Sequence, residues 1–325
     1  MPASARGKLK PPAAGTGLVC EAFYDRHLTG PGHPESPARL DAVRKALGGE
    51  EFRGLVRKIA ARHATAEEIL ACHDKRFFEE VRERIASGAG VLDWGDTRVC
   101  ADSFEAAMLA AGGAIAAVDA VFVGKVANAF CAVRPPGHHA TPSRAMGFCI
   151  FNNVAIAARY AQKSCGVAKV LIADWDVHHG NGTQEIFYED PSVLYFSTHQ
   201  WPWYPGTGSR GEVGRGKGDG TTMNRPLPAG AGGDEAVRDF GELADAADGF
   251  KPELVMISAG FDSRAGDPLG QLRLTDDDFA ALTGICCRIA DRHAEGRVVS
   301  LLEGGYNLSG LASAAAAHVR ALAGP

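Results

Sequence analysis

Short apolar runs alternate with stretches of helical periodicity along this sequence, and that alternation restricts the fold more than any other feature. The apolar runs predict strands over 17–23, 127–133, 169–173, 193–197, 253–258 and 297–302. Apolar residues recur at helical spacing over 37–47, 66–87, 103–123, 153–163, 233–248, 275–294 and 309–322. Alternating strands and helices are typical of mainly parallel sheets with helices on both faces. The sequence therefore predicts an α/β fold around one mainly parallel, multi-stranded sheet.

The chain is predicted to form a single domain, because its 325 residues contain no internal repeat and no low-complexity linker. Residues 1–16 contain Ser, Arg, Lys and Pro but no apolar core, so we expect a flexible tail rather than a signal peptide. The folded domain is then 17–325. Within it, the Ala-rich stretch 103–123 predicts a buried helix capped by Ser103, and the Gly-rich stretch 205–220 predicts a long loop.

Composition excludes several classes of function. A formal net charge of −5 argues against a general binder of nucleic acid or of anionic membranes. No uninterrupted apolar run reaches the roughly 18 residues that a transmembrane helix needs. The eight cysteines include no C-x-x-C pair, which is typical of reduced thiols rather than a disulfide framework. We therefore expect a cytoplasmic protein that binds neither nucleic acid nor membrane.

The most informative polar stretch runs from Asp174 to Gly182, directly after the predicted strand 169–173. In an extended segment, residues two apart point the same way, so Asp174, Asp176 and His178 share one face. An Asp-x-His pair on one face can bind one metal ion. A single Asp or His would fit an ordinary polar loop, but two Asp, two His and two Gly within nine residues fit that interpretation poorly.

Three further polar clusters follow predicted strands. His138 and His139 lie on a turn stiffened by two prolines, Asp262 follows 253–258, and Tyr306 follows a Gly-Gly pair after 297–302. Taken singly, these residues have ordinary explanations, such as a structural histidine, a helix cap or a half-buried aromatic. Asp262 together with Asp176 and His178 would supply three ligands and leave one position open. That arrangement is typical of catalytic rather than structural Zn²⁺.

These groups suit hydrolysis of an unactivated acyl bond. A bound metal polarises the carbonyl and lowers the pKa of water toward ~7. One histidine accepts the proton of water, and a protonated one donates to the leaving amine, while a Tyr306 hydroxyl stabilises the oxyanion. Asp174 could hold the far nitrogen of His138, and Asn181 that of His139 without a charge. The two imidazoles would then differ in pKa, as a base and an acid require.

The four clusters resemble those of the histone deacetylase superfamily, the zinc-dependent deacetylases with an arginase-like α/β fold. The resemblance runs in the family's order from His33-Pro34-Glu35 to Gly305-Tyr306-Asn307 and so covers nearly the whole chain. It implies that the zinc ligands are Asp176, His178 and Asp262, with His138 and His139 as the tandem catalytic histidines and Tyr306 as the oxyanion donor. It also implies a structural potassium ion at Asp174, Asp176, His178, Ser197 and Thr198. The acyl-lysine tunnel would be lined by Gly147, Phe148, Tyr204 and Leu269.

Details of the resemblance favour a class II-like enzyme that removes acetyl or other acyl groups from lysine side chains. Asn181 stands where class I members carry Asp, and Tyr306 is the residue of active members. Leu269 occupies the gatekeeper position at which polyamine deacetylases carry Glu, and a leucine cannot attract a distant ammonium. Tyr204 replaces a commoner Phe. The partner is then an acyl-lysine peptide or protein; the alternative is an acetylpolyamine or another small N-acetylated amine.

Two other readings of the same motifs fit less well. The related binuclear manganese ureohydrolases need Asp-x-His-x-Asp and a later Asp-x-Asp, but here Gly180 and Arg264 stand at the final positions of these motifs. A non-catalytic reader of acyl-lysine has no need of the complete set of ligands, histidines and tyrosine. The ligand set tolerates Fe²⁺ as well as Zn²⁺. The sequence carries no indication of oligomeric state.

Overall fold

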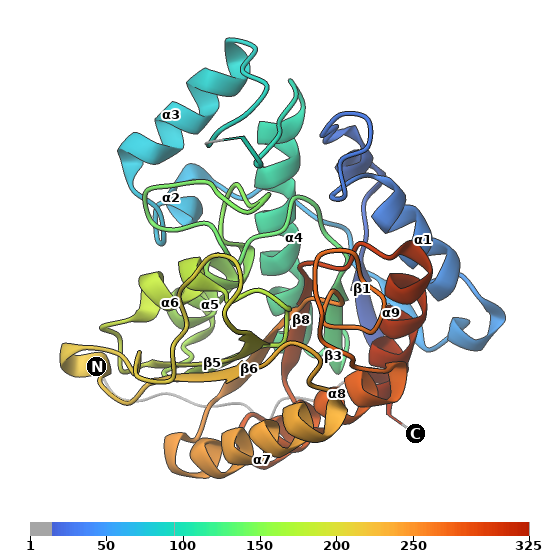
Figure 1. Cartoon of the computed structure of the whole chain (residues 1–325), viewed down its shortest axis with the longest axis vertical. Coiled ribbons are helices and arrows are strands. Elements are labelled where there is room, and N and C mark those ends of the chain that lie inside the picture. The colour runs from blue at the N-terminus through green and yellow to red at the C-terminus, as the bar shows by residue number, and fades with distance from the viewer. Residues whose placement is uncertain (1–14, 94, 325) are drawn as a thin grey trace.

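One parallel sheet forms the centre of the protein. The computed structural model describes residues 15–93 and 95–324. Its strands are β1 (Thr16–Val19), β2 (Val56–Lys58), β3 (Asn128–Cys131), β4 (Val170–Asp174), β5 (Val193–Gln200), β6 (Thr222–Leu227), β7 (Leu254–Ala259) and β8 (Val298–Leu302). They pair in the order β2-β1-β3-β8-β7-β4-β5-β6, and every neighbouring pair is parallel. The predicted α/β architecture with one mainly parallel sheet is confirmed (Figure 1).

Helices cover both faces of this sheet. They are α1 (Ala38–Leu47), α2 (Ala66–Ile69), α3 (Lys75–Ala86), α4 (Ser103–Phe122), α5 (Asn153–Cys165), α6 (Asn181–Phe187), α7 (Gly233–Phe250), α8 (Asp276–His293) and α9 (Leu308–Ala323). On one face α7, α8, α9 and α1 pack side by side in that order, and on the other α4, α5 and α6 do so (Figure 1). Each layer buries its apolar stripe against the strands.

Helix α4 is long and apolar enough to cross a membrane, but 78% of its most apolar window is buried inside the protein. It packs against β1, β3, β8 and α5, as a core helix does. Ser103 is not its cap, contrary to the prediction. The residue at the cap position is Asp102, whose side chain makes no capping bond, while the Ser103 hydroxyl accepts a hydrogen bond from the Cys100 amide (2.8 Å).

Some predicted boundaries were wrong. The stretch 66–87 forms two helices, α2 and α3. Helix α2 ends at Ile69, and the Asp74 amide donates to the Pro142 carbonyl (2.8 Å) instead of to a carbonyl one turn earlier, so the chain leaves the helical path before α3 begins. Thr16, expected in the tail, is the first residue of β1, and residues 1–14 lie outside the described residues. Strands β2 and β6 and helix α6 were missed, because they are short and pairing with neighbours stabilises them.

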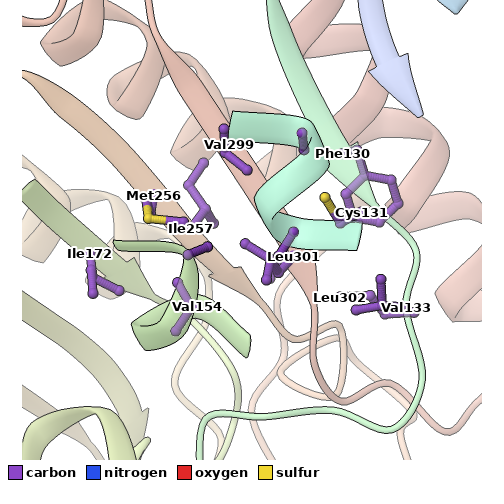
Figure 2. Close-up of a cluster of buried hydrophobic side chains, with 14 of the residues drawn as sticks. Phe130, Cys131, Val133, Val154, Ile172, Met256, Ile257, Val299, Leu301 and Leu302 are labelled. Carbon is purple, nitrogen blue, oxygen red and sulfur yellow. The ribbon is translucent and has the colours of Figure 1, made fainter. Parts of the chain in front are cut away.

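The apolar core lies where the central strands β3, β8, β7 and β4 adjoin. Their side chains are buried on both faces of the sheet, and Figure 2 shows those of Phe130, Leu301, Ile257 and Ile172 together with Val154 of α5. Parallel strands all end at the same edge of a sheet. The four polar clusters of the sequence therefore meet at one edge, above a rigid core.

The close packing of α4 gives a testable prediction. A Cβ atom at Gly112 would lie 1.8 Å from the Arg62 carbonyl oxygen and 2.5 Å from the Ala64 amide nitrogen. We expect Gly112→Ala to lower the free energy of unfolding by about 1–3 kcal/mol, measured by chemical denaturation, because backbone atoms must move. Gly241→Ala is the control, since Gly241 in α7 has no neighbouring atom within 4 Å. That change should raise stability by up to about 1 kcal/mol. Equal stability of the two variants would contradict the packing described.

Candidate metal centre and active site

Asp176, His178 and Asp262 converge where β4 and β7 end. All three are buried, and one potential ligand atom from each lies within 4.8 Å of the others. His178 Nδ1 is 3.0 Å from Asp176 Oδ1 and 3.3 Å from Asp262 Oδ2. The backbone amides of Val177 and Gly304 hold the outer carboxylate oxygens, donating to Asp262 Oδ1 (2.8 Å) and Asp176 Oδ2 (2.8 Å). The ligand atoms are thereby aimed at one point.

This group fits a divalent cation. Asp262 Oδ2 is buried and, although His178 Nδ1 lies 3.3 Å away, no donor among the described residues is aligned to hydrogen-bond to it. Leaving such an oxygen unpaired is unfavourable, and a cation would satisfy it. Burial and the nearby Asp176 raise the pKa of Asp262 to about 7. Burial disfavours the charged form of His178, but the two carboxylates outweigh it and raise its pKa to about 9. Without a cation, the site therefore holds protons that a cation would displace.

The two adjacent histidines have different partners. His138 Nδ1 lies 3.0 Å from Asp174 Oδ2, and His139 Nδ1 lies 2.8 Å from Asn181 Oδ1. Burial disfavours a charged ring at His138, yet the pKa rises to about 10 because Asp176 and Asp174 lie beside it. The pKa of His139 falls well below its usual range through burial and the positive charges of His138 and His178. The two histidines, although adjacent in the sequence, thus differ strongly in basicity.

Glu303 holds the turn that bears these histidines, and the sequence analysis gave it no role. Its Oε2 accepts hydrogen bonds from the Gly137 and His138 amides (2.7 and 3.1 Å), and its Oε1 accepts from the Ser258 hydroxyl (3.1 Å). Burial raises its pKa to about 7, although His138 opposes the shift. The sequence did carry one sign of this role: Glu303 is an acidic residue directly after a predicted buried strand. A buried carboxylate is unfavourable unless it is paired, so such a residue can be expected to hold other groups.

Tyr306 is held beside a buried arginine that sequence reasoning also missed. The Arg39 guanidinium lies 5.0 Å from the ring centre and donates to the Gly305 carbonyl (2.7 Å). Arg39 pairs with Glu35, which also pairs with Arg134. Burial raises the pKa of Tyr306 well above its usual value, so the hydroxyl stays protonated and can donate a hydrogen bond. No local pattern links Arg39 in α1 to Gly305, 266 positions later, which is why Arg39 was missed.

The residues assigned to the substrate tunnel surround this centre. The Tyr204 ring packs edge-on against His139 (5.1 Å) and His178 (5.9 Å), whereas the Phe148 ring packs against Tyr306 (5.9 Å). The two aromatics therefore approach the centre from different sides. At position 147 a Cβ would lie 2.4 Å from His139, so only glycine fits there.

The remaining predicted residues have other partners. The backbone of Leu269 is held by Trp203, whose Nε1 donates to the Leu269 carbonyl (2.9 Å). Ser197 pairs with Asp174 across β4 and β5, and its hydroxyl bonds to His199 Nδ1 (2.9 Å). Thr198 follows it on β5 and is buried. The potassium site at these residues stays a prediction.

Tyr195 was not predicted, and its hydroxyl donates to Asp174 Oδ2 (3.2 Å).

A family model described as "Histone deacetylase domain" matches residues 33–322. The chain belongs to the histone deacetylase family. It is 42% identical over 310 residues to histone deacetylase 14, chloroplastic, of Arabidopsis thaliana, covering 90% of this chain and 73% of that one. It is 41% identical over 303 residues to the human polyamine deacetylase HDAC10, covering 89% of this chain and 44% of that one. A solved HDA15 HD domain superposes with a TM-score of 0.88 at 38% identity, covering 95% and 91% of the two chains.

Family membership identifies this chain as an amide-hydrolysing enzyme, and zinc dependence is the norm of the family. The buried Asp-His-Asp group is suited to such a metal ion. The sequence prediction of the family, the fold and the class of chemistry is therefore confirmed.

The protons held by the metal-free site predict a pH dependence of metal binding. His178, with its pKa raised to about 9, and Asp262, with its pKa raised to about 7, must both lose protons to become ligands. Lowering the pH from about 8 to about 6 should weaken Zn²⁺ binding at least about 100-fold, since at least one proton is displaced per ion. Competition with a chromophoric chelator at each pH measures this. Asp262→Asn is the control and should bind weakly throughout. An affinity that does not change with pH would contradict the assignment of these ligands.

Proposed function

We propose that this enzyme removes acetyl, or other acyl, groups from lysine side chains, with Zn²⁺ held by Asp176, His178 and Asp262. The observation that carries the proposal is the buried cluster of three convergent ligand atoms beside two histidines with different partners. The relatives named histone deacetylases support a lysine substrate. The apolar gatekeeper Leu269 supports it too.

The bound metal would polarise the acyl carbonyl and lower the pKa of a water molecule. His139 enters the reaction neutral, because burial and the charges of His138 and His178 lower its pKa, and with Nδ1 on Asn181 its Nε2 accepts the proton of the water. His138 enters protonated beside Asp174 and delivers a proton to the leaving amine. Different partners thus give adjacent imidazoles the roles of base and acid.

Tyr306 would donate a hydrogen bond from its hydroxyl to the oxyanion, which forms on the carbonyl oxygen when water attacks the acyl carbon. Phe148 and Tyr204 would hold the four methylenes of a lysine between flat apolar faces, and Gly147 would leave room for His139. We also propose a structural potassium ion at Asp174, Asp176, His178, Ser197 and Thr198. Fe²⁺ remains a second metal that these ligands accept.

A small acetylated amine is the second candidate substrate, and one observation favours it. A cavity of about 420 Å³ opens beside Tyr204 and is lined by two carboxylates, Asp93 and Asp96, together with Arg144 and Met146. A carboxylate pair is suited to an ammonium group. The human relative named as a polyamine deacetylase is in keeping with this.

The predicted partners and location follow from the same considerations. We expect an acylated peptide or small amine as the substrate, and neither nucleic acid nor membrane, given the net charge of −5. The cytoplasm is the predicted location. Among the relatives, the Arabidopsis enzyme is chloroplastic by its name.

The proposal is tested by comparing hydrolysis of an acetyl-lysine peptide with hydrolysis of N-acetylated polyamines. We expect the peptide to be turned over faster, and Tyr306→Phe to lower kcat about 10²–10³-fold, because an oxyanion donor is lost. Bound zinc, measured by mass spectrometry, should be the same in both proteins. Turnover of the polyamines alone would replace the lysine proposal with the second candidate. No turnover of either substrate by the zinc-loaded protein would refute both.

The gatekeeper position gives a separate prediction. Leu269→Glu should raise kcat/KM for an N-acetylated polyamine about tenfold relative to the peptide, because one charge contact contributes about 1–2 kcal/mol. Leu269→Gln is the matched control, with a similar shape and no charge, and should leave the ratio of the two substrates unchanged. If the Glu and Gln variants behave alike, charge at this position does not select the substrate.

A further inference from the structure

The segment that carries Tyr306 contains two glycines, the residue type with the greatest intrinsic backbone freedom. It joins β8 to α9, and two glycines, Gly304 and Gly305, stand immediately before the tyrosine. Gly305 has a φ of +121°, a conformation that side chains other than glycine rarely adopt. Glycines lose much conformational entropy when they become ordered. A tyrosine that follows two glycines therefore needs a fixed point elsewhere in the structure to hold its backbone in place.

Asp267 supplies such a point. Its Oδ2 accepts hydrogen bonds from the backbone amides of Tyr306 (2.7 Å) and Asn307 (3.0 Å). The Asn307 side chain adds a third contact, donating to the Gly266 carbonyl (2.9 Å). Two consecutive amides on one carboxylate oxygen fix the orientation of the peptide that leaves Tyr306, and hence the direction of its side chain.

Asp267 is itself well fixed. It lies five residues after the metal ligand Asp262, and its amide donates to the Arg264 carbonyl (3.2 Å). Its Oδ1 accepts from the Leu269 amide (2.9 Å), and the Leu269 carbonyl in turn accepts from Trp203 Nε1 (2.9 Å). One short loop therefore connects a metal ligand, the oxyanion donor and the rim of the tunnel.

We propose that Asp267 is a positioning residue for Tyr306: its carboxylate holds the Tyr306 and Asn307 amides so that the phenol hydroxyl reaches the oxyanion. This rests on the proposed function, which gives Tyr306 the role of oxyanion donor. Asp267 touches neither substrate nor metal in this scheme. Its proposed effect on the chemical step passes through the tyrosine.

Losing this anchor should slow the chemical step rather than weaken substrate binding. Asparagine at 267 is nearly isosteric but uncharged, and its NH₂ group cannot accept: in either orientation it loses hydrogen bonds to the Leu269, Tyr306 and Asn307 amides, and those that remain are no longer strengthened by a negative charge. A displacement of about 1 Å in a catalytic group costs on the order of 10²-fold in rate. We therefore expect Asp267→Asn to lower kcat about 10–100-fold with KM within about threefold of the wild type.

A double-mutant cycle with Tyr306→Phe separates positioning from general structural support. Values of kcat and KM for an acetyl-lysine peptide are measured for the wild type, each single variant and the double variant, each zinc-loaded and full-length. If Asp267 acts through Tyr306, the double variant should be no slower than Tyr306→Phe, within about threefold. Asp277→Asn is the matched control, because the Asp277 side chain is exposed and makes no hydrogen bond in the described part of the chain. It should leave kcat unchanged.

Three outcomes would overturn the inference. Wild-type kcat in Asp267→Asn means that the carboxylate does not position the tyrosine. A loss of kcat that is equally large in the Tyr306→Phe background, accompanied by lower zinc content, means a general structural role. Full activity of Tyr306→Phe would refute the proposed role of Tyr306 and this inference with it. The Tyr306→Phe variant alone therefore distinguishes a failure of the proposed function from a failure of the Asp267 inference.

A measurement on the wild type keeps the inference testable if Asp267→Asn fails to fold. Hydrogen–deuterium exchange of a peptide covering 303–309 should show slow exchange at the Tyr306 and Asn307 amides, because the carboxylate protects them. Exchange as fast as in an exposed loop would show that the two hydrogen bonds are not maintained and would overturn the inference.

Discussion

Four carboxylates, Asp174, Asp176, Asp262 and Glu303, are buried together at one edge of the sheet, and the site is organised around compensating their charge. Isolated buried carboxylates would be strongly unfavourable. Backbone amides at the strand ends satisfy several of the oxygens, histidines share others, and Asp262 Oδ2 is left for a cation. The same interactions that make burial tolerable also aim the ligands at one point.

Rigidity comes from the way that distant parts of the chain meet at this edge. Glu303 at the end of β8 holds the backbone of the histidine turn after β3 and the Ser258 hydroxyl of β7. Arg39 of α1 joins the segment before Tyr306 to the buried Glu35. Each catalytic side chain is thus supported by a group from another strand or helix. Sites built on the ends of buried strands tolerate little displacement, which suits a reaction that depends on geometry.

The adjacent imidazoles show how partners set chemistry. His138 and His139 share one turn, and the centres of their rings lie 4.0 Å apart. Two carboxylates, Asp176 and Asp174, raise the pKa of His138, whereas burial and the charges of His138 and His178 lower that of His139. Two neighbouring rings in one turn therefore differ strongly in basicity. In the proposed function, Leu269 and the carboxylates near Tyr204 would act on the identity of the amine rather than on the reaction.

The sequence by itself determined the alternation of strands and helices, the metal ligands as candidates, and the two histidines with Asp174 and Asn181 as their expected partners. These features are local: apolar periodicity reports burial, and polar residues after a strand must lie at its carboxyl end. Tertiary structure alone decided that the stretch 66–87 divides into two helices and that β5 extends to Gln200 beside β6. It likewise decided that Arg39, Glu303 and Asp267 support residues far away in the chain. Such contacts depend on how the strands are ordered in the sheet, and no pattern in a single segment encodes that order.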